Sequence, residues 1–269
     1  MFCANGAGGD HLQPLKPGQT TITVADPRAT TPAEAAILGA QLLAEAERQN
    51  IRRLLRADQQ HDRIVAWSLV RLGLSQAFQV SPSEWVFSRR EDQRPFVLAP
   101  RGLPPFQFSL AHTRGLIALL VTSAALGGVD IEHMERTDDL ALVAPKICAA
   151  SELAALDRLS GGAWKERFFE LWTLKEAYAK ARGAETVPRW SEVAFEINAH
   201  QAATVQLAPG VADTSVGWQF WRQRITAEHM LAAAVRGGAA SETCALQRVR
   251  IGLREQMAWL ETLGESTLF

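Results

Sequence analysis

The chain of 269 residues repeats one order of predicted elements, and this repeat limits the choice of fold more than any other feature. Each half gives a helix, a turn with proline, two short strands, and a histidine that leads into an apolar strand. In the first half these parts are a helix over 61–74, a turn at Pro82, strands over 85–87 and 106–108, and His112 before the apolar strand 116–121. In the second half they are a helix over 165–182, a turn at Pro188, strands over 193–197 and 218–221, and His229 before the apolar strand 230–235. This order predicts two similar α+β halves.

The predicted boundaries divide the chain into four parts. Residues 1–30, rich in Gly and Pro at their start, are expected to form a loose N-terminal arm. The sequence Thr31-Pro32-Ala33-Glu34 then supplies an N-cap, a first-turn proline and an early acid for a helix that runs to about Asn50. The first α+β half covers 31–123, the second covers 124–242, and 243–269 form a helical tail that packs back onto the body.

Composition limits the classes of partner and the compartment. Hydrophobic residues make up 47% of the chain, and 28 basic residues nearly balance 29 acidic ones. No overall charge therefore favours binding to nucleic acid or to a membrane surface. The three cysteines, Cys3, Cys148 and Cys244, are far apart and lack metal-ligand spacing, which suits a reducing cytoplasm. Because we find no signal-peptide pattern and no apolar run long enough to span a bilayer, we expect a soluble cytoplasmic protein.

The predicted helix over 165–182 contains neither Pro nor Gly, and Gly183 ends it. Leu171, Leu174 and Tyr178 fall on a core-facing stripe, whereas Glu176 and Lys180 lie one turn apart on a neighbouring row. A carboxylate and an ammonium therefore lie together beside the buried face. One interpretation is an ordinary ion pair worth a few tenths of a kcal/mol, and the other is a functional site.

A second acidic element follows a buried apolar strand. In an extended segment, Asp130 and Glu132 project from the same face about 7 Å apart, so they can share one hard cation. With Glu176 they would form an all-oxygen set of the kind Mg²⁺ uses when phosphates supply its other ligands, and Lys180 would face the same phosphates. Any exposed strand can also produce Asp-x-Glu by chance, so only the combination with the helix points to a site.

Basic residues of the first half are open to two interpretations. Five arginines, Arg48, Arg52, Arg53, Arg56 and Arg63, form either a solvated helix face or a site for a phosphate. His112 is either a strand-end histidine satisfied by the backbone or a contact for a ligand.

Two motifs together resemble one family. They are Gly128-Val129-Asp130-Ile131-Glu132 and, about forty residues later, Trp172-Thr173-Leu174-Lys175-Glu176-Ala177-Tyr178-Ala179-Lys180. This pair is similar to Gly-[Ile/Val]-Asp-x-Glu and Trp-[Ser/Thr]-x-Lys-Glu-[Ala/Ser]-x-x-Lys of the 4′-phosphopantetheinyl transferases of the larger, surfactin-synthetase-activating type. The resemblance spans about 45–235. It implies a monomer whose two halves form an intramolecular pseudo-dimer, each a small antiparallel sheet packed on a long helix, with coenzyme A between them.

The resemblance also implies roles for individual residues. Metal ligands would be Asp130, Glu132 and Glu176, and the catalytic residues would be Glu176 and Lys180. The residues that would bind coenzyme A are Arg63, Arg94, Pro95, Ala111, His112 and Lys180. Ser109 and Ala111 depart from the family's Phe-Asn-x-Ser-His-Ser, and Gln93 stands where the family has Gly. Two lysines that some members use for the 3′-phosphate lack a clear counterpart, and Arg48, Arg52 or Arg53 are candidates to replace them.

The implied function is transfer of the 4′-phosphopantetheine arm of coenzyme A, with Mg²⁺ as cofactor, to a serine of an acyl, peptidyl or aryl carrier-protein domain, with release of 3′,5′-ADP. The first alternative is a non-catalytic module of the same fold that binds coenzyme A or a carrier domain. The second is an unrelated Mg²⁺-dependent phosphohydrolase, which would not explain the ordered His112, Asp130-x-Glu132 and Glu176-x-x-x-Lys180 elements.

Overall fold

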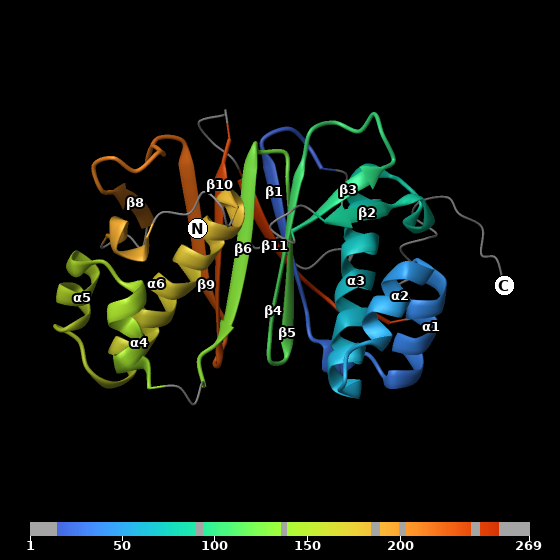
Figure 1. The fold of residues 1–269 in the computed structure, drawn as a ribbon, viewed down its shortest axis with the longest axis horizontal. Helices are drawn as coiled ribbons and strands as arrows, with labels where there is room; N and C mark the ends of the chain where they lie inside the picture. The colour runs from blue at the N-terminus through green and yellow to red at the C-terminus, as the bar shows by residue number, and fades with distance from the viewer. Residues whose placement is uncertain are drawn as a thin grey trace.

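The computed structural model describes residues 15–89, 94–135, 139–183, 189–198, 203–237 and 243–252 (Figure 1). A four-stranded sheet has the order β11-β1-β5-β4, and a three-stranded sheet has the order β6-β10-β9. All neighbours are antiparallel except β1 and β11, which are parallel. The strands are β1 Gln19–Ala25, β4 Gln107–Thr113, β5 Leu116–Thr122, β6 Leu126–His133, β9 Trp218–Thr226, β10 His229–Arg236 and β11 Thr243–Val249.

Helices cover the outer faces of the two sheets (Figure 1). One side carries α1 Pro32–Leu42, α2 Glu45–Arg52 and α3 Ala57–Phe78, and the other carries α4 Leu140–Ile147, α5 Ala150–Leu156 and α6 Gly161–Arg182. Short 3-10 turns and two-stranded sheets complete each side: η1 Pro27–Ala29, η2 Pro82–Glu84, β2 Val86–Arg89 with β3 Pro95–Ala99, and η4 Trp190–Glu192, β7 Val193–Ile197 with β8 Ala203–Leu207.

The predicted α+β class is confirmed, and the elements follow one order twice. The run from β1 to β5 consists of a strand, two short helices, a helix of 22 residues, a 3-10 turn, a two-stranded sheet and a closing hairpin. The run from β6 to β10 repeats this order. The pairing is also the same, because the first strand of each run pairs antiparallel with the last. This is the arrangement that two similar halves would give, and their division at about residue 124 remains a prediction.

Strand β5 illustrates how the core is built, because it is buried on both faces. Ile117, Leu119 and Val121 belong to the apolar cluster under α3, whereas Ala118 and Leu120 belong to the cluster between the two sheets. Alternate side chains of a strand point to opposite faces, so a strand between two apolar layers needs a continuous apolar run. Strand β10 behaves in the same way between α6 and the other sheet.

Three predicted segments were wrong. The single helix expected to run to about Asn50 is divided into α1 and α2, because the backbone is extended at Leu43 and Ala44. Residues 19–25 belong to a strand, β1, rather than to a loose arm, because the sequence Gln-Thr-Thr-Ile-Thr-Val-Ala is rich in β-branched residues that pack well on a pleated surface. Residues 243–249 form strand β11 rather than a helix, because β1 offers them an edge with which to pair. The part of the predicted helical tail from 253 onward lies outside the described residues.

Candidate functional site

Gly128 allows α6 to approach strand β6 closely. A Cβ atom at this position would overlap the carbonyl oxygen of Ala177 and the amide of Ala181. The glycine therefore lets the helix backbone lie directly on the strand. Asp130 lies two residues further along β6, so it shares this face and lies beside the last turns of α6.

We expect Gly128→Ala to destabilise the protein by about 3 kcal/mol, because the new methyl group has to displace helix backbone. Urea denaturation followed by circular dichroism measures the effect. The matched control is Gly162→Ala near the start of α6, where an added Cβ meets nothing within 4 Å. The control should be neutral or slightly stabilising. Equal stability of Gly128→Ala and the wild type would contradict the close approach.

Three charged side chains gather where α6 crosses β6. The ammonium of Lys180 donates to Oδ1 of Asp130 at 2.7 Å, and Oδ2 of Asp130 is buried without a hydrogen-bond partner. Burial raises the pKa of Glu176, the negative charge of Asp130 raises it further, and Lys180 partly offsets both. The carboxylates of Asp130 and Glu176 are thus close enough to repel each other. Lys180, one helical turn after Glu176, lies beside both.

This donor set suits a cation. A buried carboxylate oxygen with no partner and a neighbouring carboxylate with a raised pKa both gain stability when a positive ion lies between them. The partly buried Glu132 falls on the same face of β6 as Asp130. Among the residues that the structure describes, however, no three His, Cys, Asp or Glu side chains gather closely enough to hold a metal ion. The three-carboxylate Mg²⁺ site therefore remains a proposal.

A cavity of about 560 Å³ opens beside these charges. Arg63 of α3, Arg94 and Pro95 at β3, His112 of β4 and Lys180 of α6 all line it. These five predicted coenzyme A residues come from four separate parts of the chain. Basic groups dominate among the charged side chains, and four aromatic ones add flat apolar surface: Trp67, Phe96, Phe106 and Phe108. Such a lining suits a polyanion that also carries an aromatic base.

The electrostatics around His112 follow from this lining. Desolvation lowers the pKa of His112, and the positive charges of Arg63 and Lys180 lower it further. The ring is still accessible to water at the cavity. Three cationic or titratable groups therefore share one space, where an anion would relieve their mutual repulsion.

Comparisons with known proteins show which family the chain resembles. Residues 127–235 match the family model described as the 4′-phosphopantetheinyl transferase superfamily. This part of the chain is similar to that superfamily. The matched residues contain both motifs, with Asp130, Glu132, Glu176 and Lys180.

Individual proteins are similar over longer or shorter parts of the chain. A phosphopantetheinyl transferase of Thraustochytrium sp. is 25% identical over 209 residues, which cover 74% of this chain and 72% of the relative. The 4′-phosphopantetheinyl transferase HetI of Nostoc sp. is 29% identical over 131 residues, which cover 42% of this chain and 55% of the relative. The chain thus spans between about half and three quarters of these relatives. A holo-(acyl-carrier-protein) synthase of Bacillus anthracis, solved in complex with CoA (3′,5′-ADP), is similar over 43% of this chain and 98% of its own, with 18% identity and a TM-score of 0.37.

Ala111 requires a correction. Its side chain is 3% exposed and lies in the apolar cluster between the two sheets, with Val129 and Ile131. It does not line the cavity, because its neighbour His112 takes the cavity side of β4 and alternate side chains face opposite ways. The predicted role of the Ala111 side chain in binding coenzyme A is therefore not supported.

Arg94 has a second role that the sequence did not suggest. Its Nη1 donates to the carbonyl oxygen of Lys180 at 3.1 Å and so satisfies one of the free carbonyls at the end of α6. The guanidinium lies against Gly183, which has φ of 93° and no room for a Cβ atom. Arg94 therefore ties the end of α6 to the edge of the cavity.

The two lysines of the helix motif have different environments. Lys175 is 2% exposed, pairs with the buried Glu152 at 2.8 Å and donates to the carbonyl oxygens of Trp190 and Val193. It anchors η4 and β7 to α6 and faces away from the cavity, whereas Lys180 lines it. We therefore expect Lys175 to matter less for the chemistry than Lys180, which kinetic assays of the two alanine variants would test.

Arg48, Arg52 and Arg53 do not line the cavity. Arg48 donates to three carbonyl oxygens at the end of α1 and pairs with Glu45, and Arg52 pairs with the same glutamate.

Two residues that no sequence motif indicated, Arg182 and Trp67, do line the cavity. Trp67 follows Arg63 by one helical turn, so this spacing could have predicted that the two side chains lie on the same face of the helix.

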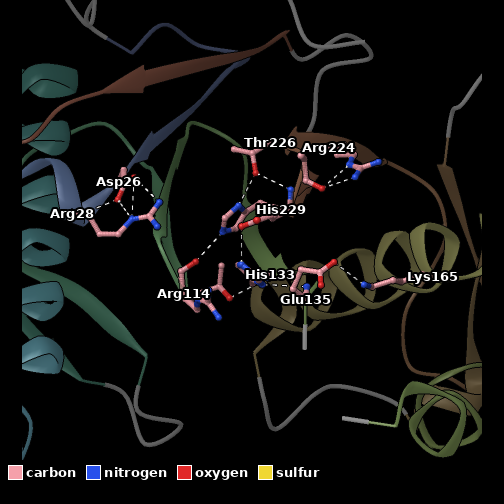
Figure 2. Close-up of polar contacts among 12 residues, drawn as sticks. Asp26, Arg28, Arg114, His133, Glu135, Lys165, Arg224, Thr226 and His229 are labelled. Atoms are coloured by element: carbon pink, nitrogen blue, oxygen red, sulfur yellow. Dashed lines mark hydrogen bonds and ion pairs between the residues drawn. The ribbon is translucent and has the colours of Figure 1, made fainter. Parts of the chain in front are cut away.

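His229, the counterpart of His112 in the sequence repeat, belongs to a structural cluster instead (Figure 2). It is 4% exposed, and its Nε2 donates to the carbonyl oxygen of Arg114 at 2.8 Å while Nδ1 lies 2.7 Å from the hydroxyl of Thr226. Its ring also makes an edge-to-face contact with His133, whose Nε2 is 3.1 Å from Glu228. These contacts tie β6 and β10 to the β4–β5 turn, so the two histidines of the repeat differ in role.

Proposed function

We propose that the protein transfers the 4′-phosphopantetheine arm of coenzyme A to a serine hydroxyl of a carrier-protein domain and releases 3′,5′-ADP. The observation that carries this proposal is the cavity in which Arg63, Arg94, His112 and Lys180 meet, with Lys180 in contact with Asp130. Coenzyme A carries a diphosphate and a 3′-phosphate, which match these basic groups, and an adenine, which matches the aromatic surface.

In the proposed reaction the serine oxygen of the carrier attacks the phosphorus next to the pantetheine arm. The bond from that phosphorus to the diphosphate bridging oxygen breaks, and its electron pair leaves with 3′,5′-ADP. Glu176 accepts the serine proton, directly or through a water, since its raised pKa makes it a better base than an ordinary glutamate. Lys180 donates to the leaving phosphate, on which negative charge grows.

Asp130, Glu132 and Glu176 would hold Mg²⁺. When bound, the ion supplies positive charge that neutralises the diphosphate. The nucleophile belongs to the carrier, so no serine of this chain is required. An acyl, peptidyl or aryl carrier domain as the acceptor, a monomeric state and a cytoplasmic location belong to the same proposal. Among the described residues, no helix combines the length and apolarity needed to cross a membrane.

Incubation of the protein with coenzyme A, Mg²⁺ and an unmodified carrier domain tests the proposal. Mass spectrometry of the carrier should show the added phosphopantetheine arm, and the arm should be absent when the carrier's acceptor serine is replaced by alanine. Binding of coenzyme A without modification of any of a panel of acyl, peptidyl and aryl carriers would support the non-catalytic alternative. Hydrolysis of coenzyme A without modification of the carrier would support a phosphohydrolase.

We expect His112 and Arg63 to contact the 3′-phosphate of coenzyme A. Because a charge-assisted hydrogen bond contributes about 1.5 to 3 kcal/mol, dephospho-coenzyme A should be a poorer substrate for the wild type by about 10- to 100-fold in kcat/KM. His112→Ala or Arg63→Ala should shrink this preference, since residue and phosphate are partners in one contact. The measurement is a double cycle of two substrates against each variant.

The matched control for that cycle is Arg52→Ala, which removes an arginine that pairs with Glu45 and does not line the cavity. It should keep the full preference for coenzyme A. An undiminished preference in both His112→Ala and Arg63→Ala would place the 3′-phosphate elsewhere.

A further inference from the structure

A buried carboxylate outside the candidate site holds the last turn of α6. Asp213 lies between β8 and β9, and its side chain is 1% exposed. The hydroxyl of Tyr178 donates to its Oδ2 at 2.5 Å, Nη1 of Arg236 lies 2.8 Å from its Oδ1, and Arg182 forms an ion pair with Oδ2. The amide of Thr214 donates to Oδ1 at 2.7 Å. Side chains of α6 and β10 thus converge on one carboxylate.

The charge states of this cluster are fixed by its surroundings. Burial would raise the pKa of Asp213, but the hydrogen bonds from Tyr178, Arg182 and the amide of Thr214 lower it overall. The carboxylate therefore stays ionised. Burial, together with the hydrogen bond to Asp213, raises the pKa of the Tyr178 phenol, so the phenol remains a proton donor.

Helix geometry places Tyr178 opposite the reactive groups. Successive residues of an α-helix are about 100° apart around its axis, so Tyr178 and Arg182 lie one turn apart, and Arg182, the last residue of α6, also lines the cavity. Glu176 and Lys180 are each two residues from Tyr178, about 200° around the axis, and therefore lie on the opposite side. On that side Lys180 contacts Asp130 and lines the cavity. Asp213 thus holds the helix end through Tyr178, on the side away from Lys180, and through Arg182 at the edge of the cavity.

We propose that Asp213 is a positioning residue for the transfer reaction, which acts through Tyr178 and Arg182 to fix the direction of Lys180. The helix ends at Arg182, and no further turn restrains Lys180. The restraint comes instead from Asp213 on one side and from Arg94, which donates to the carbonyl oxygen of Lys180, on the other. A shift of about 1 Å in a catalytic group can cost about 100-fold in rate, so this restraint has kinetic consequences. The inference rests on the proposed function for its kinetic part alone.

Asp213→Asn tests the inference, because it keeps the shape of the side chain and removes its charge. We expect kcat for transfer to fall by about tenfold while KM for coenzyme A changes by less than about threefold, since Lys180 acts most strongly on the leaving group. The matched control is Asp157→Asn, the same chemical change at an exposed position after α5, which should leave both constants unchanged. A kcat within about twofold of the wild type in Asp213→Asn would overturn the inference.

A spectroscopic readout needs no catalytic activity. Tyr178 is the single tyrosine of the chain, so NMR signals of a ring-labelled tyrosine at one neutral pH report on this contact alone. Asp213→Asn should shift these signals, and the control variant should leave them unchanged. Unchanged signals in Asp213→Asn would disprove the contact, and a wild type inactive towards carriers would overturn the proposed function instead.

A double-mutant cycle separates positioning from general stability. If Asp213 acts through Lys180, adding Asp213→Asn to Lys180→Ala should lower the rate no further than Lys180→Ala alone. Losses that multiply would assign Asp213 a merely structural role and overturn the inference. If circular dichroism shows that Asp213→Asn does not fold, Tyr178→Phe takes its place in the cycle. That variant removes one donor and keeps the ring contacts with Phe195 and Trp218.

Discussion

Asp130→Ala should lower kcat/KM for phosphopantetheine transfer by about a thousandfold and leave the fold intact. The substitution removes the carboxylate whose buried Oδ2 is the best-placed group for a cation, and charge stabilisation of this kind is worth about 100- to 1,000-fold per group. The fold should persist because the partner of Asp130, the Lys180 side chain, is 31% exposed and can be hydrated. Glu176→Ala should cause a comparable loss. Transfer assays and thermal unfolding of the same preparations measure the two effects.

Asp130→Asn is the sharper companion variant, because it keeps the side-chain volume and removes the charge. Calorimetric titration of Mg²⁺ in the presence of coenzyme A provides a second readout, and we expect heat of binding for the wild type and none for Asp130→Asn. Glu196→Gln on the exposed part of β7 serves as the control for loss of one acid. Transfer at the wild-type rate by Asp130→Ala would refute the proposed metal site.

Lys180→Ala should lower kcat by about 100-fold and weaken coenzyme A binding by less than about tenfold. The reason is that negative charge on the departing diphosphate grows in the transition state, so the ammonium contributes more there than in the ground state. Single-turnover kinetics give the rate at saturation, and calorimetry gives the affinity.

Lys165→Ala on the same helix is the matched control, because Lys165 is 37% exposed and pairs with Glu135 at the far end of α6. It should behave like the wild type. Lys180→Arg keeps the charge beside Asp130 and checks that any loss does not come from unfolding. If the affinity of Lys180→Ala for coenzyme A collapsed while the saturated rate held, Lys180 would be a ground-state anchor, and the role assigned to it would be wrong.

Local sequence patterns predicted the elements that carry the candidate site. The run without Pro or Gly before Gly183 predicted α6, whose end at Arg182 the structure reproduces. The apolar runs at 116–121 and 230–235 predicted strands, which the structure buries on both faces. These predictions hold because helix and strand periodicities are local properties of the chain. The N- and C-terminal strands could not be predicted in the same way, since β1 and β11 gain their stability by pairing across more than 200 residues.

The sequence by itself determined which chemical groups are available: the carboxylates Asp130 and Glu176, the ammonium of Lys180, and the imidazole of His112. Their spacing along a strand and a helix is encoded locally, and so is the glycine that lets these two elements touch. Only the tertiary structure decided which of two similar groups faces the cavity. Lys175 is neutralised by Glu152 in the interior whereas Lys180 reaches the cavity, and His229 is saturated by hydrogen bonds whereas His112 is not buried. The physical reason is that the burial and charge neighbours of a side chain depend on contacts between distant segments, which residue spacing does not specify.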